Sequence, residues 1–168
     1  MKQFVKLLFF DEAAIWQTQP NTYSWRPIGN PLAVPTSKAR GIKSRLNLMG
    51  CVDFATGEVQ YRELEANTTG PDVVAFLDAL VQQADPACPS VLVLDRASIH
   101  TCKAVQEKRD VWREKGLIVV HLPPYSPELN PMEGQWRKLK YHALKTRHVE
   151  HKADLRRAVG GAKWGIAL

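Results

Sequence analysis

Three acidic residues stand at positions where a metal-dependent reaction would use them. Asp11 and Asp95 each follow a short apolar run, and Glu133 falls in the first turn of an amphipathic segment. Short apolar runs are typical of buried parallel strands, and ligands bind at the carboxyl ends of such strands. Neighbouring strands lie about 4.8 Å apart, so we expect Asp11 and Asp95 to reach one shared cation.

The three carboxylates together predict a site for two divalent ions. Oxygen ligands favour a hard ion such as Mg²⁺, with Mn²⁺ as a substitute. Two such ions about 4 Å apart clamp the attacking and leaving oxygens of an in-line phosphodiester displacement. Each aspartate has an ordinary alternative, as a residue that begins a turn after a strand. For Glu133 the alternative is a capping box with Asn130 at the start of a helix.

Residues 122–140, with the sequence LPPYSPELNPMEGQWRKLK, would position Glu133. The first three prolines fix φ and favour extended conformations in the residues before them, which indicates a stiff connector. Asn130 is expected to cap the following helix, with Pro131 at its first position. At about 100° per residue the apolar side chains of this helix form one stripe, with Glu133 on its border. The stripe contains Met132, Trp136 and Leu139.

The rest of the chain supplies the strands and helices that would hold these residues. An apolar strand over residues 4–10 is expected to end at Asp11, and one over 91–94 to end at Asp95. Strands that alternate with helices in the second half imply parallel pairing, so the predicted fold class is α/β, with a mixed sheet flanked by helices. The other expected elements are a hairpin over 46–52 and 59–64, helices from residue 70 to the break at 85–86 and over about 103–115, and a strand over 117–120.

Length, charge and cysteine content limit the classes of protein. The 168 residues suit a single domain, with a core over about 4–147 and a helical C-terminal segment over about 150–168. Lys and Arg number 23 against 17 Asp and Glu, and the resulting charge of +6 favours a polyanionic partner. No apolar run reaches membrane-spanning length, and the run that ends at Phe10 is too short for a secretion signal. Three scattered cysteines indicate reduced thiols in a cytoplasmic protein.

Cations near the three carboxylates are candidates for phosphate contacts. Arg137 and Lys140 follow Glu133 on the helical wheel, and Lys138 lies between them. Cations at the end of a helix also suit the helix macrodipole, which is the alternative role for these residues. His100 follows Asp95 by five residues and is expected to contact a phosphate or the metal-bound water, or else to cap the next helix.

Several of these segments together resemble the catalytic blocks of DDE-superfamily transposases. The resemblance is strongest to the bacterial insertion-sequence relatives of mariner. The spacing of 37 residues between the second aspartate and the glutamate also fits that family. The matching segments are Phe10-Asp11-Glu12, the W-x-x-x-G element from Trp25 to Gly29, Leu94 to His100, and Leu122 to Glu133, which together run from about residue 5 to 145.

The resemblance implies a ribonuclease-H-like domain in which Asp11, Asp95 and Glu133 bind two Mg²⁺ ions. Enzymes of this family cut DNA at transposon ends with water and join the freed 3′ hydroxyl to target DNA. The implied partners are therefore transposon-end and target DNA, and a nucleoid-associated location in the cytoplasm follows. Arg96, which would lie beside the metal site, is a further candidate for contact with DNA.

Two departures from the family pattern leave alternatives open. Arg96 follows the second aspartate, where the family usually has Asn, and a cation there would hold a phosphate or weaken metal binding. The chain begins at its first catalytic strand, so we expect a helix-turn-helix region for end recognition to come from a separate or fused polypeptide. A homodimer is considered as the assembly. The alternative functions are a DNA-binding remnant without catalysis, and a structure-selective nuclease or RNA-strand hydrolase of the same fold.

Overall fold

The computed structural model describes residues 5–16, 27–29, 45–144, 151–162 and 164–168. Its centre is a mixed sheet with the strand order β5-β4-β1-β2-β3-β6. β1, β2 and β3 pair in antiparallel fashion, while β4 and β5 extend the sheet in parallel from β1, and β6 runs parallel to β3. The strands are β1 (Lys6–Trp16), β2 (Arg45–Asp53), β3 (Val59–Leu64), β4 (Ser90–Leu94), β5 (Leu117–His121) and β6 (Ile166–Ala167).

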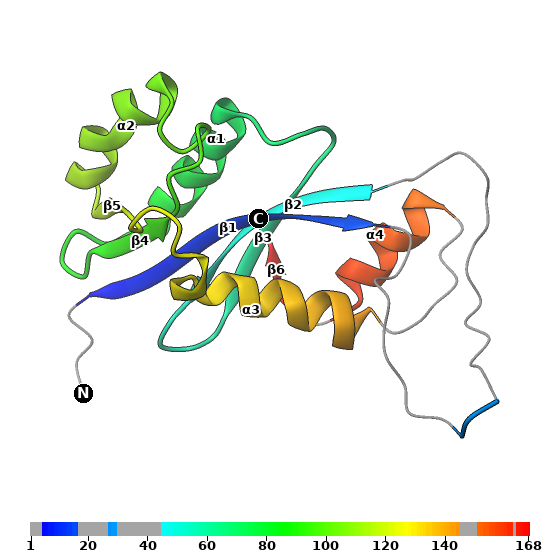
Figure 1. Ribbon diagram of the computed structural model, residues 1–168. Coiled ribbons are helices and arrows are strands. Elements are labelled where there is room, and N and C mark those ends of the chain that lie inside the picture. The colour runs from blue at the N-terminus through cyan, green and yellow to red at the C-terminus, as the bar shows by residue number, and fades with distance from the viewer. Residues whose placement is uncertain (1–4, 17–26, 30–44, 145–150, 163) are drawn as a thin grey trace.

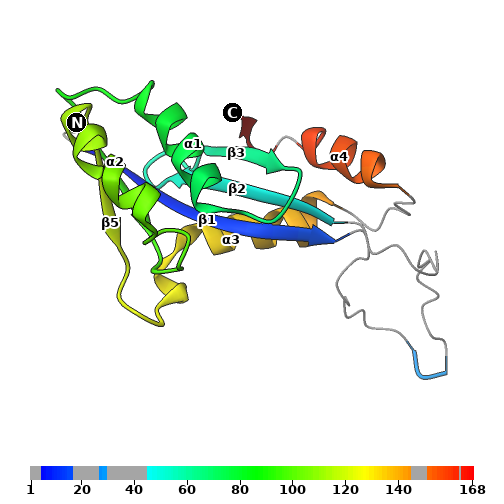
Figure 2. The same ribbon diagram turned by 90° about the horizontal axis from the view of Figure 1, so that it is seen from above.

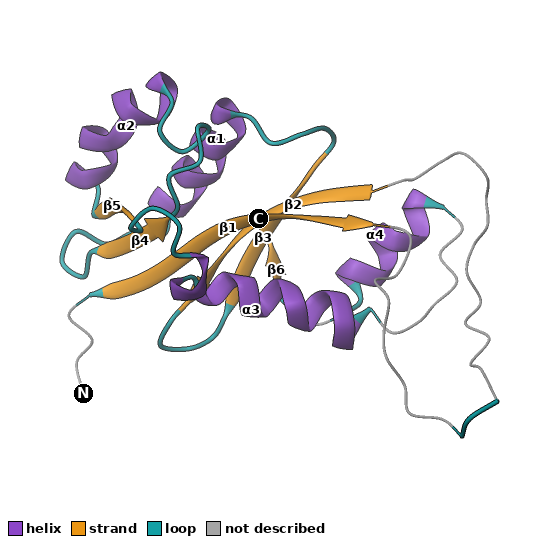
Figure 3. Ribbon diagram, viewed as in Figure 1, coloured by secondary structure: helices purple, strands orange, loops and turns teal. Residues whose placement is uncertain are grey.

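Helices cover both faces of this sheet, as the two views in Figures 1 and 2 show. α1 and α2 lie on one face, and α3 and α4 pack on the other. The predicted α/β class with a mixed sheet flanked by helices is therefore confirmed. Figure 3 marks the helices α1 (Gly70–Val81), α2 (Lys103–Glu114), α3 (Pro131–Lys138) and α4 (Lys152–Gly160); a 3-10 turn, η1 (Pro127–Leu129), precedes α3, and a π-helical segment, η2 (Leu139–Ala143), continues it.

Strand alternation divides the apolar side chains of β1 between two cores. Leu8 and Phe10 point to the side of α1 and α2, where they join a cluster that includes the fully buried Phe76 and Trp112. Residues of odd number in β1 point the other way, and Ile15 packs into the cluster under α3 and α4. The same alternation places Asp11 on the α3 face and Glu12 on the opposite face.

Local signals in the sequence predicted most of the helix boundaries. The backbone N–H of Thr69 donates to the Asp72 carboxylate at the start of α1, which completes a capping box. Gly116 adopts a φ of +91° after α2, a conformation that costs glycine little. The hairpin between β2 and β3 and the strands β4 and β5 also match the predicted ranges within two residues.

One strand prediction and one helix prediction need correction. β1 does not end at Asp11 but continues to Trp16, because residues 12–16 pair with the first half of the long strand β2. The C-terminal segment is not helical throughout, since Ile166 and Ala167 pair with β3 after α4 has ended. No helix in the described part of the chain is long and apolar enough to cross a membrane.

Candidate metal-binding active site

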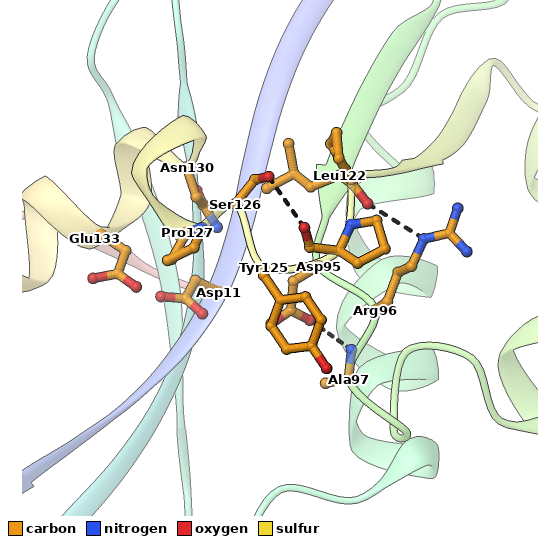
Figure 4. A pocket seen from close by; sticks show the side chains of 12 residues that line it. Asp11, Asp95, Arg96, Ala97, Leu122, Tyr125, Ser126, Pro127, Asn130 and Glu133 are labelled. Carbon is orange, nitrogen blue, oxygen red and sulfur yellow. Dashed lines mark hydrogen bonds between the residues drawn. The ribbon is translucent and has the colours of Figure 1, made fainter.

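The three acidic residues line one pocket on the α3 face of the sheet. The pocket has a volume of about 440 Å³, and its walls come from β1, the loop after β4, the proline-rich segment after β5 and the start of α3. In Figure 4 Asp11 lies between Glu133 on one side and Asp95 on the other. Asp11, Asp95, Glu133 and Arg96, all predicted from the sequence, are therefore gathered around the same cavity.

Strand register accounts for the closeness of the two aspartates. Phe9 of β1 is the parallel partner of Val93 of β4. Continued two residues past this last pair, the same register would bring Asp11 next to Asp95, which follows the end of β4, and both residues line the pocket. Both aspartates were predicted to follow the carboxyl ends of their strands. Asp95 does follow β4, whereas Asp11 lies in the middle of β1.

Asp11 occupies an environment that disfavours its charged form. Burial, and then the negative charges of Glu12, Glu133 and Asp95, raise the pKa of Asp11 from 3.8 to about 7, against the opposing effect of a backbone hydrogen bond. The indole Nε1–H of Trp136 donates to Oδ2 of Asp11 at 3.0 Å. By its spacing Trp136 belongs to the apolar stripe of α3, and nothing in that spacing signals this second role.

Asn130 ties the start of α3 to β1 next to Asp11. Its Oδ1 accepts from the backbone N–H of Met132 at 3.1 Å, so the predicted N-cap is confirmed. Its Nδ2 donates to the carbonyl oxygen of Phe10 at 2.9 Å, and the side chain is buried. The backbone N–H of Asn130 donates to the carbonyl of Pro127, not to Glu133, so the capping-box alternative is wrong and the exposed Glu133 carboxylate remains available to the pocket.

Gly50 allows α3 to pack closely against the sheet beside Asp11. It is the antiparallel partner of Asp11 in β2. A Cβ atom at this position would lie 3.0 Å from Met132 Cε, 3.3 Å from the Trp136 ring and 2.9 Å from the carbonyl oxygen of Gln60. Only glycine leaves room for this approach, and the approach brings the Trp136 indole to Asp11.

Asp95 is held from the side away from the pocket. Its Oδ1 accepts from the backbone N–H of Ala97 at 2.8 Å and lies 2.6 Å from Nδ1 of His100. The other ring nitrogen of His100, Nε2, lies 2.7 Å from Oε1 of Glu12. Burial alone lowers the pKa of His100, but the hydrogen bonds to Glu12 and Asp95 and their negative charges raise it above its usual value overall. Each ring nitrogen thus faces one carboxylate oxygen.

The five predicted DNA-contacting residues occupy different positions. Arg96 is exposed on the pocket wall, where its Nε donates to the carbonyl oxygen of Leu122. Arg137 and Lys138 are exposed on α3 beyond the pocket, and Lys140 is half-buried in η2. His100 is buried, with both ring nitrogens engaged by carboxylates, so it presents no free donor to a phosphate and does not act as a simple helix cap.

The donor set suits hard divalent cations. All three side chains offer carboxylate oxygens, and their mutual repulsion, which contributes to the raised pKa of Asp11, is relieved by a cation between them. Within the described ranges, no three acidic, histidine or cysteine side chains already form a compact metal-binding cluster. Glu133 is exposed and hence free to adjust by side-chain rotation, while Asp11 and one oxygen of Asp95 are held by hydrogen bonds.

A mixed sheet of this order, with acidic residues contributed by β1, the loop after β4 and the helix α3 that follows β5, defines the class of ribonuclease-H-like domains. A family model described as DDE superfamily endonuclease matches residues 6–156, and the chain belongs to this family. The predicted family is thereby confirmed. Trp25 of the W-x-x-x-G element lies outside the described residues.

Solved structures of the Mos1 mariner transposase share the fold. The paired-end complex with Mn matches with a TM-score of 0.69 and 19% identity over 92% of this chain and 47% of that one. The strand transfer complex matches with a TM-score of 0.66 and 18% identity over 94% and 46%. The isolated Mos1 catalytic domain matches with a TM-score of 0.62 and 16% identity over 92% and 68%. This chain thus spans about half the length of the transposase chains in those complexes, and comparison with curated proteins returned no match.

Proposed function

We propose that this chain is the catalytic domain of a transposase that cuts DNA at transposon ends and joins the cut end to target DNA, with divalent metal ions as cofactors. The observation that carries the proposal is the meeting of Asp11, Asp95 and Glu133 around one pocket of about 440 Å³. Membership of the DDE superfamily endonuclease family supports the same chemistry. Solved complexes of the similar Mos1 transposase include one with Mn and one with Mg.

Asp11, Asp95 and Glu133 would hold two Mg²⁺ ions, for which Mn²⁺ can substitute. When bound, such a pair polarises the phosphate and stabilises the attacking and leaving oxygens of an in-line displacement. In the first reaction a water oxygen bonds to phosphorus and the bond from phosphorus to the 3′ oxygen breaks, which leaves a 3′ hydroxyl and a 5′ phosphate. In the second, that hydroxyl oxygen bonds to a phosphorus of target DNA and one target phosphodiester bond breaks. One phosphodiester bond replaces another, so joining needs no external energy source.

The remaining predicted residues would hold the DNA strands. Arg96 projects from the pocket wall and suits a phosphate next to the reacting one. Arg137, Lys138 and Lys140 continue along α3 and η2 and suit the adjoining backbone. His100 contributes indirectly, because it is buried behind Asp95.

The assembly follows from the same proposal. The described residues would act as one catalytic domain that binds transposon-end and target DNA. End recognition would be supplied by a helix-turn-helix region, separate or fused, and pairing of two ends favours a homodimer. The site of action would be the cytoplasm, in association with the nucleoid.

The test is DNA cleavage by purified protein with Mg²⁺ or Mn²⁺. Asp95→Asn and Glu133→Gln each remove one metal-binding charge with little change of shape, so we expect each to abolish nicking and strand transfer. Asp110→Asn and Glu114→Gln are matched controls, because both carboxylates are exposed on α2, away from the pocket, and should leave activity unchanged. Cleavage that survives Asp95→Asn and Glu133→Gln would refute the proposal.

One observation favours a second function, that of a DNA-binding remnant. Arg96 places a cation directly after a proposed metal ligand and on the wall of the same pocket. If this charge prevents metal binding, the chain would bind DNA but take up no Mg²⁺ at millimolar concentration in calorimetry. Products that contain only nicks, without joined strands, would instead indicate a structure-selective nuclease.

A further inference from the structure

We propose that Glu12 and His100 form a bridge that positions Asp95 for metal binding at a set distance from Asp11. The inference rests on the proposed function, because it assigns a task to two residues behind the metal ligands. Neither residue would touch metal or DNA. Both are positioning residues, which act through the orientation of the Asp95 carboxylate.

The hydrogen bonds on Asp95 are arranged unequally between its two oxygens. Oδ1 is engaged by the backbone N–H of Ala97 at 2.8 Å and by Nδ1 of His100 at 2.6 Å. Two donors on one oxygen orient the carboxylate and leave Oδ2 for a ligand. The Asp95 side chain is 54% exposed, so without these donors it would sample several rotamers in water.

His100 is itself immobilised by its surroundings. Its side chain has no exposed surface, and it meets the ring of Phe10 edge-on at a centroid distance of 5.4 Å. The side chain of Glu12 is 19% exposed, and its Oε1 lies 2.7 Å from Nε2, the second ring nitrogen of His100. A buried ring engaged at both nitrogens has one orientation, so the position of Asp95 follows from the position of Glu12.

Glu12 adds a direct link to the other metal ligand on the same strand. It follows Asp11 in β1, and the two side chains point to opposite faces of the sheet. The bridge from Glu12 through His100 to Asp95 therefore connects the loop after β4 to the strand that carries Asp11. A substitution in the bridge is therefore expected to alter the distance between the carboxylates of Asp11 and Asp95, even though neither aspartate is itself replaced.

The two nitrogens of His100 can be replaced one at a time. In His100→Asn the amide nitrogen takes the place of Nδ1, and it can still donate to Asp95. In His100→Gln the amide nitrogen takes the place of Nε2, and it can still donate to Glu12. If the bridge positions Asp95, His100→Gln, which loses the direct contact with Asp95, lowers the Mn²⁺ affinity by about 10- to 100-fold, whereas His100→Asn, which loses only the link to Glu12, lowers it less.

Mn²⁺ binding, measured by calorimetry on the full chain without DNA, is the readout, together with the melting temperature in chelator. Glu12→Ala should also lower the affinity, and Glu12→Gln should restore it, because the glutamine carbonyl still accepts from Nε2. Trp112→Phe is the matched control. It removes a hydrogen bond of 2.7 Å from a buried ring N–H to the Asp78 carboxylate, between α1 and α2, and should lower the melting temperature without a change in Mn²⁺ affinity.

The outcomes separate this inference from the proposed function. Equal loss of affinity in His100→Asn and His100→Gln, or unchanged affinity in both, overturns the bridge while the metal site stands. A loss in Trp112→Phe as large as in His100→Gln assigns the effect to stability and also overturns it. A wild-type chain that binds no Mn²⁺ overturns the proposed function and the bridge with it.

Discussion

Asp11 is expected to destabilise the metal-free protein at neutral and alkaline pH. The cause is its position in β1, where burial and the neighbouring carboxylates Glu12, Glu133 and Asp95 oppose its negative charge. Asp11→Asn keeps the shape of the side chain and an oxygen that accepts from the Trp136 indole, but it cannot ionise. We therefore expect the variant to be more stable than the wild type above about pH 7 when metal is absent.

The pKa shift of Asp11 sets the size and the sign of this difference in the free energy of unfolding. The folded protein holds the proton more tightly than the unfolded chain, because the pKa rises from 3.8 to about 7. Below the lower value both states are protonated and the group contributes nothing. Between the two values the unfolded chain releases the proton first, so stability falls as pH rises, and above about 7 the full cost remains. A shift of about three units corresponds to about 4 kcal/mol at most.

The assay is urea unfolding in the presence of a chelator, at several pH values from about 4 to about 9. The quantity of interest is the free energy of unfolding of Asp11→Asn minus that of the wild type. It should be near zero at the acidic end and should rise to at most about 4 kcal/mol at the alkaline end, or about 10 °C in melting temperature. Asp110→Asn, at an exposed position of α2, should show no such trend. Added Mn²⁺ should stabilise the wild type and leave Asp11→Asn unaffected.

Two results would refute this reasoning. One is a stability difference between Asp11→Asn and the wild type that does not change with pH. The other is a wild type that is the more stable protein at alkaline pH without metal. Either result would mean that the Asp11 charge is compensated in the fold, and the electrostatic argument for a cation at this site would lose its support.

Three further predictions concern the surroundings of the pocket. Asn130→Ala removes a helix cap and a buried hydrogen bond to β1, so urea unfolding should show a loss of about 2 kcal/mol, and cleavage should fall as α3 loses its anchor. Gly50→Ala should cost about 1–3 kcal/mol, because its Cβ would approach a backbone oxygen and the Met132 side chain to 3.0 Å or less; a variant as stable as wild type would contradict the close packing. Arg137→Ala combined with Lys140→Ala should weaken DNA binding and reduce its salt slope by about 1 for each lost phosphate contact, and an unchanged slope in a salt titration would exclude both residues from the interface.

Much of the fold follows from local patterns, and the failures have physical causes. Apolar periodicity predicted the hairpin, the two central helices and the strands β4 and β5, because burial on one or both faces imposes that periodicity. The end of β1 was misplaced because two consecutive acidic residues usually mark a strand end. Here β1 continues past Asp11, because both acidic side chains are accommodated. Asp11 lines the pocket beside α3 on one face of the sheet, and Glu12 is hydrogen-bonded to His100 on the other.

The residues of the candidate site fall into the same two groups, those that local patterns predict and those whose roles depend on tertiary contacts. The identities of Asp11, Asp95 and Glu133, and the cap at Asn130, could be predicted from residue type and spacing. The roles of Trp136, Gly50 and His100 could not, because each depends on an atom of a distant segment. The indole that reaches Asp11 comes from a residue 125 positions away, and its spacing in the helix is that of any core tryptophan.

The sequence alone was enough to propose which residues would bind metal and to predict most of the strands and helices that carry them, since residue chemistry and helix or strand periodicity are properties of short segments. Only the tertiary structure decided how these residues meet. The parallel pairing of β1 with β4 brings Asp11 and Asp95 to one pocket, and the hydrogen bond from Asn130 to Phe10 places the start of α3 next to Asp11. Register and helix docking are set by side-chain packing between segments far apart in the chain, so no local pattern specifies them.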